Sequence, residues 1–305
     1  MSSSNAGKKP VIGFVGLGKI GAPIAERLLA AGYDLAVFDV APAAMRPFAD
    51  RAQIAFTPAD TADRADAIIA CLQTADQYAE AVLGDTGIVH GRRARIYLHI
   101  GTTGRQCVQT ISAALDRCGV ATLDAPMSGG VAGAKAGTLV SMISGPRAAF
   151  DAMEPMVSSY ARRIVYLGAQ PGLAQAMKLV NNMLSAANLA AAAEVMVVGA
   201  KAGLPVDVML DVLNHGTGQN SATLTKIPNN VVPRTFDCGA SLDNIFKDLT
   251  AYAAEAQAAG IDSAIFPTVI RFFREAASQG SAGDDLSTVV RPLERAAGVE
   301  LKRDR

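Results

Sequence analysis

The sequence predicts an α/β domain with a mainly parallel sheet, followed by an all-helical domain. In the first half of the 305-residue chain, short apolar runs alternate with stretches of helical spacing, and after Leu167 such runs largely stop. A cluster of glycine and proline at 168–172 separates the two halves. An apolar periodic stretch, 173–203, starts there, and we expect it to form a long helix that joins the domains. We therefore divide the chain into domains 8–169 and 170–305.

Seven short, largely apolar runs in the first half are typical of strands buried on both faces. Helical stretches lie between most of them, which favours parallel pairing with right-handed crossover connections. The expected strands are 11–15, 35–39, 67–72, 96–100, 121–125, 138–144 and 163–167.

The composition argues against several classes of protein. Lysine plus arginine equals aspartate plus glutamate, 28 of each, so we expect no nucleic-acid partner. The most apolar run, 184–200, contains Asn188 and Glu194, so we expect no membrane span. Residues 1–10 are polar and small, and are expected to form a disordered leader rather than a signal peptide. The four cysteines and three histidines lack metal-ligand spacing, which favours a metal-free cytoplasmic protein with reduced thiols.

A glycine-rich turn follows the first expected strand and opens an expected helix. Gly16 allows the tight turn, Gly18 allows a pyrophosphate to approach the backbone, and Gly21 allows close packing of helix on strand. The helix N-terminus offers free N–H groups and the positive end of its dipole to phosphates. Strand, turn and helix in this order favour a dinucleotide site over a merely structural turn. The candidate residues are Gly16, Leu17, Gly18, Lys19, Ile20 and Gly21.

An acidic residue, Asp39, ends the second expected strand, 18 residues after Gly21. A carboxylate at this place in a dinucleotide-binding unit accepts hydrogen bonds from the ribose hydroxyls of NAD. The same charge would repel the 2′-phosphate of NADP, and no arginine follows it directly. The sequence therefore favours NAD over NADP.

A second glycine-rich segment follows the expected strand 121–125. Ser128 offers a hydroxyl, and the consecutive Gly129 and Gly130 let backbone N–H groups converge on an anion. Because ligands of parallel sheets bind at the carboxyl ends of the strands, a substrate carboxylate is the expected guest. The alternative is a loop that only turns the chain.

Two polar residues of the long helix, Lys178 and Asn182, are four apart and therefore project from one face. Oxidation of an alcohol needs a base for the hydroxyl proton, and a lysine serves if burial lowers its pKa from ~10.4 toward ~7–8. Asn182 could hold the hydroxyl or orient the amine. Taken alone, a helical lysine is more often a solvated surface residue. The ordered set of motifs favours the catalytic interpretation.

Taken together, the motifs resemble those of the β-hydroxyacid dehydrogenase family. The segment 13–21 is similar to its cofactor signature, and 124–131 is similar to its substrate-binding motif. The segment 178–182 matches the catalytic motif, in which the family uses the lysine as general acid/base and the second asparagine for substrate. The resemblance also implies that Thr102 and Lys247 lie at the cofactor.

This family includes 3-hydroxyisobutyrate dehydrogenase and tartronate semialdehyde reductase. The resemblance implies a Rossmann domain and no metal. It also implies a helical second domain like that of 6-phosphogluconate dehydrogenases, swapped or packed in a homodimer or homotetramer. Two positions depart from the family pattern. Ala174 replaces the second member of a glycine pair, and Gln219 stands where some relatives have arginine. The second departure argues against a second anionic group on the substrate.

We predict an NAD-dependent oxidoreductase that interconverts a short β-hydroxy acid, a small carboxylate substrate, and its semialdehyde, with Lys178 as general acid/base. Methyl, hydroxyl, sulfonate and longer β-substituents stay open. One rival is an imine reductase of the same architecture, but such enzymes usually lack this lysine. The other rival is a non-catalytic cofactor-binding sensor.

Overall fold

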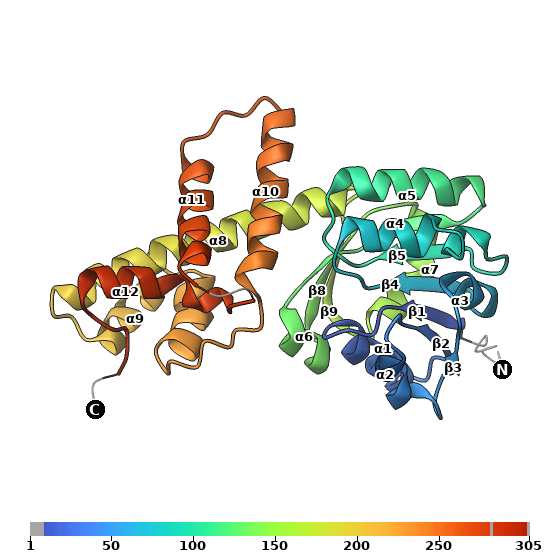
Figure 1. Ribbon diagram of the computed structural model, residues 1–305, viewed down its shortest axis with the longest axis horizontal. Helices are drawn as coiled ribbons and strands as arrows, with labels where there is room; N and C mark the ends of the chain where they lie inside the picture. Colours follow the sequence, from blue (N-terminus) through green and yellow to red (C-terminus); the bar gives the residue numbers. More distant parts are fainter. Residues whose placement is uncertain (1–8, 281–282, 304–305) are drawn as a thin grey trace, which may run out of the picture. The chain divides into compact units, whose positions relative to one another are not determined.

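The computed structural model describes residues 9–280 and 283–303, so most of the expected leader lies outside the described residues. The chain forms two compact units, 1–178 and 179–305 (Figure 1). We call them the sheet unit and the helical unit. The fold class predicted from the sequence is confirmed, with a parallel α/β first half and a helical second half.

A six-stranded sheet forms the centre of the sheet unit, with strand order β3-β2-β1-β4-β5-β6. All its neighbouring strands pair in parallel, which gives the doubly wound arrangement. The helices α1, α3, α4 and α5 alternate with these strands along the chain. The strands are β1 (Ile12–Val15), β2 (Leu35–Phe38), β3 (Gln53–Ile54), β4 (Ala67–Ala70), β5 (Ile96–His99) and β6 (Ala121–Asp124). The helices are α1 (Gly21–Ala30), α2 (Pro42–Met45), α3 (Pro58–Arg64), α4 (Ala75–Leu83) and α5 (Arg105–Arg117), with short 3₁₀ turns at Arg46–Phe48 and Ile88–His90.

Residues after β6 form a second, three-stranded sheet, which the sequence analysis had not separated from the first. Its order is β7 (Met127–Ser128), β8 (Leu139–Ile143) and β9 (Ala161–Tyr166). β7 pairs with β8 in antiparallel register, and β8 pairs with β9 in parallel. A bridge between Asp124 and Ser144 joins β6 to the segment that follows β8. The helices α6 (Gly130–Ala136) and α7 (Arg147–Val157) precede β8 and β9, respectively.

The six-stranded sheet is buried on both faces, as the continuous apolar runs predicted. Ile12 and Phe14 of β1 belong to a core cluster that also contains Leu28 of α1. Val11 and Val15 belong to a second cluster, shared with α3, α4 and α5. Because successive residues of a strand point to opposite faces, the two clusters lie on the two sides of the sheet.

The long helix α8, Leu173–Lys201, lies close to the expected stretch 173–203, and from Leu179 onward it belongs to the helical unit. Met183, Leu189 and Met196 of α8 share one core cluster with Leu249 and Phe273 of later helices. The remaining elements are α9 (Val206–His215), a π-helix η3 (Ala222–Val231), α10 (Leu242–Ala258), α11 (Ile265–Ser278), a 3₁₀ helix η4 (Leu286–Val290) and α12 (Arg291–Ala297).

Helix α8 has two apolar faces. The apolar stripe with the most regular spacing in the sequence is exposed, and a different face packs in the core. An 18-residue window of α8 reaches a mean hydropathy of 1.6, with 39% of it buried. By length and composition the helix could cross a membrane, but a helix that packs in a protein core can have the same length and composition, so the expectation of no membrane span stays a prediction. The buried face contains Leu179, Met183, Ala186, Leu189 and Ala193. The exposed face contains Met177, Val180, Leu184, Ala191, Val195 and Val198.

Candidate functional site

The glycine-rich turn lies between β1 and α1, where the sequence placed it, and its glycines differ in what requires them. A Cβ on Gly16 would overlap the carbonyl oxygen of Cys71, and a Cβ on Gly21 would overlap that of Gly16. Both are therefore required by the packing of the chain itself. A Cβ on Gly18 would meet no described atom within 4 Å. The open space above Gly18 fits the close approach of a ligand rather than of the protein.

Asp39 is held against this turn. One carboxylate oxygen accepts a hydrogen bond from the Leu17 amide at 2.7 Å, and the other accepts from the Ala41 amide at 2.8 Å. No side chain caps the N-terminus of α1 at Ile20, so its positive dipole end stays available to an anion. N–H groups that can donate to a phosphate and a carboxylate that can accept from a ribose hydroxyl therefore lie close together, as a dinucleotide site requires.

A buried polar network fixes the carboxyl end of β6 to the start of α8. One carboxylate oxygen of Asp124 accepts from the amides of Gly172 and Gln175 at 3.0 and 2.9 Å, and so caps the long helix. The Gln175 side-chain amide donates to the other oxygen at 2.7 Å. Burial raises the pKa of Asp124 to about 6, although these hydrogen bonds lower it. The start of α8 is thus fixed to the sheet by a buried carboxyl group.

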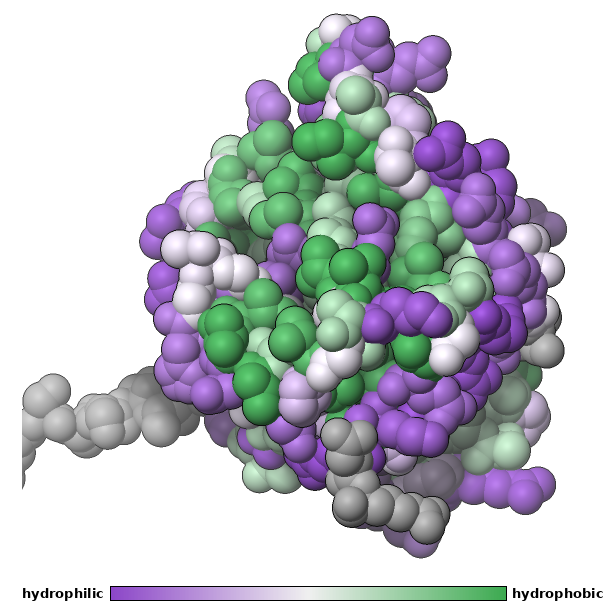
Figure 2. Space-filling model, turned by 90° about the vertical axis from the view of Figure 1, so that its left-hand side faces the viewer, coloured by the Kyte–Doolittle hydropathy of each residue, from purple (hydrophilic) through white to green (hydrophobic). Residues whose placement is uncertain are grey.

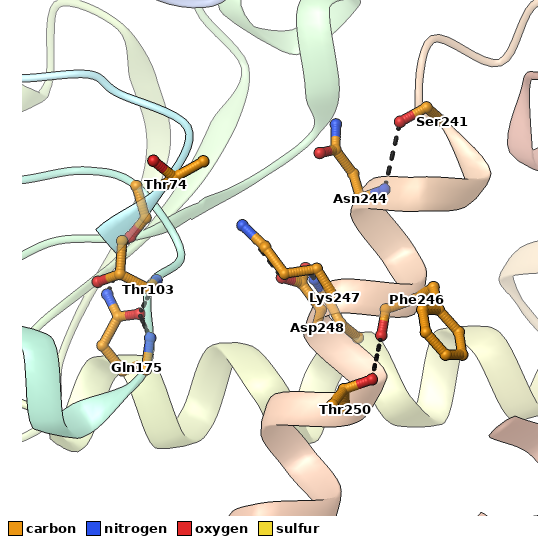
Figure 3. Close-up of polar contacts among 12 residues, drawn as sticks. Thr74, Thr103, Gln175, Ser241, Asn244, Phe246, Lys247, Asp248 and Thr250 are labelled. Carbon is orange, nitrogen blue, oxygen red and sulfur yellow. Dashed lines mark hydrogen bonds and ion pairs between the residues drawn. The ribbon is translucent and has the colours of Figure 1, made fainter. Parts of the chain in front are cut away.

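The same Gln175 also holds the loop that follows β5 (Figure 3). Its carbonyl oxygen accepts from the amides of Thr103 and Gly104 at 2.9 and 3.0 Å. Its side-chain amide additionally donates to the Gly101 carbonyl oxygen at 2.9 Å. Thr102, the residue expected at the cofactor, lies inside this clamped loop.

The side chain of His99 contacts the same loop, at Thr103. Its ring nitrogens lie 3.2 Å from the Tyr97 hydroxyl and 2.9 Å from the Thr103 hydroxyl, and its ring stacks on Tyr78 at 3.7 Å. Burial lowers the pKa of His99 to about 3, so the ring is neutral at physiological pH. His99 therefore positions Thr103 as a neutral ring.

The second glycine-rich segment lies at the start of α6. Ser128 ends strand β7, while Gly129 and Gly130 adopt φ angles of +129° and +61°. Such angles suit glycine, because a Cβ would be strained there. Residues 128–130 thus combine a hydroxyl with a sharply turned backbone, as the carboxylate-binding interpretation requires. That role stays a prediction.

The two helix residues predicted to be catalytic both lie half-buried on one face of α8. The Asn182 amide donates to a carboxylate oxygen of Asp248 at 2.6 Å, and its carbonyl accepts from Asn181 at 3.1 Å. Lys247, also predicted at the cofactor, follows on α10, with its ammonium 3.7 Å from the other Asp248 oxygen (Figure 3). Asp248 therefore fixes the orientation of Asn182.

One further polar residue in the helical unit has no sequence signal. Lys226 of η3 is half-buried, and its ammonium donates to the Ser185 hydroxyl of α8 at 3.2 Å. Burial lowers its pKa, and the Cys238 thiol acts in the opposite direction. Lys226 could not be predicted from the sequence, because a single lysine in an irregular helix gives no pattern. Gln175 was not predicted either, although it lies only three residues before Lys178.

The described residues contain no group of three or more histidine, cysteine, aspartate or glutamate side chains suited to a metal ion.

Two family models cover most of the chain. Residues 11–168 match the NAD binding domain of 6-phosphogluconate dehydrogenase. Residues 172–293 match the model described as the NAD-binding domain of NADP-dependent 3-hydroxyisobutyrate dehydrogenase. The division between the two models falls at the glycine-rich segment 168–172.

Similar proteins agree with these models. Human mitochondrial 3-hydroxyisobutyrate dehydrogenase is 35% identical over 231 residues, which are 74% of this chain and 68% of that protein. The NAD-dependent L-serine dehydrogenase of Pseudomonas aeruginosa is 32% identical over 286 residues, 91% of this chain and 96% of that protein. The structure of Mycobacterium tuberculosis 3-hydroxyisobutyrate dehydrogenase with L-serine is similar at a TM-score of 0.85 and 29% identity, covering 94% of this chain and 99% of that one. The chain is an NAD-binding oxidoreductase that acts on a CH–OH group, and it belongs to the β-hydroxyacid dehydrogenase family.

Proposed function

We propose that the protein oxidises a short β-hydroxy acid to its semialdehyde with NAD, reversibly, and that Lys178 is the general acid/base. The observation that carries this proposal is the placement of Lys178. It lies half-buried, three residues after Gln175, on the helix end that Asp124 caps. A proton-transfer group needs such a fixed position to act in the transition state.

Each residue then has a distinct task. NAD supplies the hydride acceptor when it is bound. Lys178 accepts the hydroxyl proton from the substrate and returns it in the reverse direction. Ser128 and the turned backbone at Gly129 and Gly130 hold the carboxylate. Asn182, oriented by Asp248, fixes the carbinol relative to Lys178.

The cofactor preference follows from Asp39. Its carboxylate is hydrogen-bonded to the glycine-rich turn, where it would accept hydrogen bonds from the ribose hydroxyls of NAD and repel the 2′-phosphate of NADP. The residues proposed to hold the cofactor are Gly16, Leu17, Gly18, Lys19, Ile20, Gly21, Asp39, Thr102 and Lys247. Domain 8–169 holds all of these cofactor residues except Lys247, and we assign oligomerisation to 170–305, which binds the substrate together with Ser128, Gly129 and Gly130.

The test is NADH production with a panel of 3-hydroxy acids, with NADP in parallel and Lys178→Ala as the variant. We expect turnover with 3-hydroxyisobutyrate or a close analogue, and a loss of kcat of about 10²–10⁴-fold in the variant at unchanged NAD affinity. Lys201→Ala is the matched control, because Lys201 is exposed at the far end of the same helix.

The two rival functions predict other outcomes. An imine reductase would reduce imines with a reduced nicotinamide cofactor, and Lys178 argues against it because such enzymes usually lack this lysine. A sensor would bind NAD without turning over any substrate in the panel. Full activity of Lys178→Ala would contradict the proposed mechanism directly.

We further propose a cytoplasmic homodimer or homotetramer with no nucleic-acid or membrane partner. The exposed face of α8 supports this, because its apolar residues recur at intervals of three and four, the spacing of a helix–helix seam. Val195 and Val198 on this face are 52% and 63% exposed. Three apolar residues that follow in the sequence are also more than half exposed: Leu204, Val208 and Val212. Figure 2 shows apolar surface gathered on one face of the molecule. A second copy of the chain would cover it.

A further inference from the structure

The polar face of α8 does not end at Asn182. At 100° per residue, Lys178, Asn181, Asn182 and Ser185 lie within an arc of ~100° on the helix surface. Asn182 is engaged by Asp248, and the next polar position, Ser185, is engaged by Lys226. The row of polar side chains on α8 thus ends at Ser185, which is hydrogen-bonded to the ammonium of Lys226 from η3.

Lys226 lacks the partner that a half-buried ammonium normally has. Its one hydrogen bond among the described residues goes to a neutral hydroxyl, and none of the described ion pairs includes it. Removing an ammonium from water is costly unless an anion or several acceptors compensate. An anionic group of a ligand would supply that compensation.

The distance along the helix sets the size of this ligand. Ser185 is three residues beyond Asn182, a rise of ~4.5 Å, and Lys226 lies one hydrogen bond from Ser185. An anionic group that reaches Lys226 from a carbinol held at Asn182 is therefore three or four bonds away from the carbinol carbon. Methyl and hydroxyl substituents are too short to reach it, whereas a carboxymethyl group has the required length.

Resting on the proposed function, we infer that Lys226 is a specificity-determining residue that binds a second anionic group, so that the preferred substrate is a β-hydroxy acid with two acidic groups. The sequence pattern pointed the other way, because Gln219 stands where some relatives have arginine. In the structure Gln219 donates to the Asn214 carbonyl oxygen at 2.6 Å, within its own loop. Lys226 supplies the cation instead, from a different element.

A matched pair of substrates expresses this inference. 3-Hydroxyisobutyrate and 2-(hydroxymethyl)succinate both carry a CH₂OH group next to the carbon that bears the carboxylate. They differ in the third substituent, which is methyl in one and carboxymethyl in the other. In both, the carbinol C–H bond breaks as hydride passes to NAD, the O–H proton passes to Lys178, and the C=O double bond of the semialdehyde forms.

The first experiment compares kcat/KM for the two substrates in the wild type, Lys226→Met and Lys226→Arg. We expect the diacid to exceed the monoacid by tenfold or more in the wild type. Lys226→Met should lower kcat/KM for the diacid by about 10–100-fold, the worth of a charge-assisted hydrogen bond, and change the monoacid less than threefold. Lys226→Arg should retain most of the preference. Equal losses for both substrates would overturn the inference.

A binding experiment separates this inference from the proposed function. Isobutyrate and methylsuccinate lack the hydroxyl and cannot react, so their affinities report on Lys226 alone. Titration calorimetry in the presence of NADH should show tighter binding of methylsuccinate, and Lys226→Met should abolish the difference while Lys178→Ala retains it. Equal affinities in the wild type would overturn the role of Lys226 even if 3-hydroxyisobutyrate is oxidised. The expected affinities without any turnover would instead overturn the dehydrogenase proposal and keep the anion site.

Discussion

The sheet unit and the helical unit build their candidate functional surfaces in different ways. In the sheet unit, the candidate surface consists mostly of backbone groups and glycines: the turn at Gly16–Gly21, the uncapped start of α1 and the turned backbone at Gly129. In the helical unit, the candidate surface consists of hydrogen-bonded pairs of side chains from elements far apart in the sequence, such as Asn182 with Asp248 and Ser185 with Lys226. A backbone site depends on local sequence, whereas a side-chain site depends on packing.

The difference separates what a substitution is expected to change. In the sheet unit, a side chain added to a glycine alters folding or cofactor binding, according to whether the protein or a ligand occupies the adjacent space. In the helical unit, replacing a polar side chain alters substrate discrimination with little change in the backbone. The predictions below test this division.

The largest effect is expected from the glycines of the turn. Gly21→Ala should destabilise the sheet unit by about 3 kcal/mol or more in urea unfolding, because the added Cβ overlaps the Gly16 carbonyl. Gly18→Ala should unfold like the wild type, within ~0.5 kcal/mol, because its Cβ meets no described atom within 4 Å. Its NAD dissociation constant should nevertheless rise about tenfold or more. Wild-type NAD affinity in Gly18→Ala would show that no phosphate lies there.

Gln175→Ala should have the next largest effect. It removes the acceptor of the Thr103 and Gly104 amides and the donor to Asp124, which leaves buried polar groups without these partners. We expect a loss of about 2–4 kcal/mol in urea unfolding, together with a lower kcat because the helix start that carries Lys178 loosens. Gln106→Ala is the control, since Gln106 is exposed on α5 in the same unit. A variant as stable as the wild type would show that the Gln175 hydrogen bonds do not stabilise this loop.

Asp124 predicts a dependence of stability on pH. Its folded pKa of about 6 lies above the value of 3.8 for a free aspartate, so the folded state binds the proton more tightly. The wild type should therefore gain stability from this group as pH falls through about 6, by about 1.4 kcal/mol between pH 7.5 and pH 5. Asp124→Asn, although less stable overall, should lack this gain. Urea unfolding at both pH values measures it, and a constant difference between the two proteins would contradict the raised pKa.

The smallest effect on the folded chain is expected on the exposed face of α8. Val195→Glu with Val198→Glu should change the unfolding free energy of the monomer by less than ~0.5 kcal/mol, because both side chains are more than half exposed. Sedimentation should nevertheless show a smaller assembly. Leu189→Glu, on the buried face at 1% exposure, should prevent folding. An unchanged assembly in the double variant would place the subunit interface elsewhere.

Much of the architecture could be predicted from the sequence because its signals are local. Apolar runs such as 11–15 and 67–72 predicted buried parallel strands, and the spacing from 173 onward predicted the long helix. The second sheet was not predicted, since a two-residue strand such as β7 has no periodicity. The π-helix η3 was not predicted either, because it contains Pro228 and its hydrogen bonds span a longer interval than the helical pattern assumes.

The site divides along the same line. Sequence motifs placed the glycine-rich turn, Asp39, the segment 128–130 and Lys178 on their elements, because each depends on spacing within a few residues. The packing of helix α8 could not be predicted in this way. The regular apolar stripe that includes Val195 and Val198 is exposed, and the face that includes Met183 and Leu189 packs in the core. A helix that is apolar on two sides carries no internal sign of which side packs first.

The sequence by itself determined the class of protein: a parallel sheet, a dinucleotide turn and a lysine on a long helix, all set by residues close together in the chain. Only the tertiary structure decided which side chains support them. Asp124 caps α8 across 48 and 51 residues of chain, Asp248 orients Asn182 across 66, and Lys226 reaches Ser185 across 41. The physical reason is that a hydrogen bond depends on distance in space, and no local pattern encodes which distant residues the folded core brings within 3 Å.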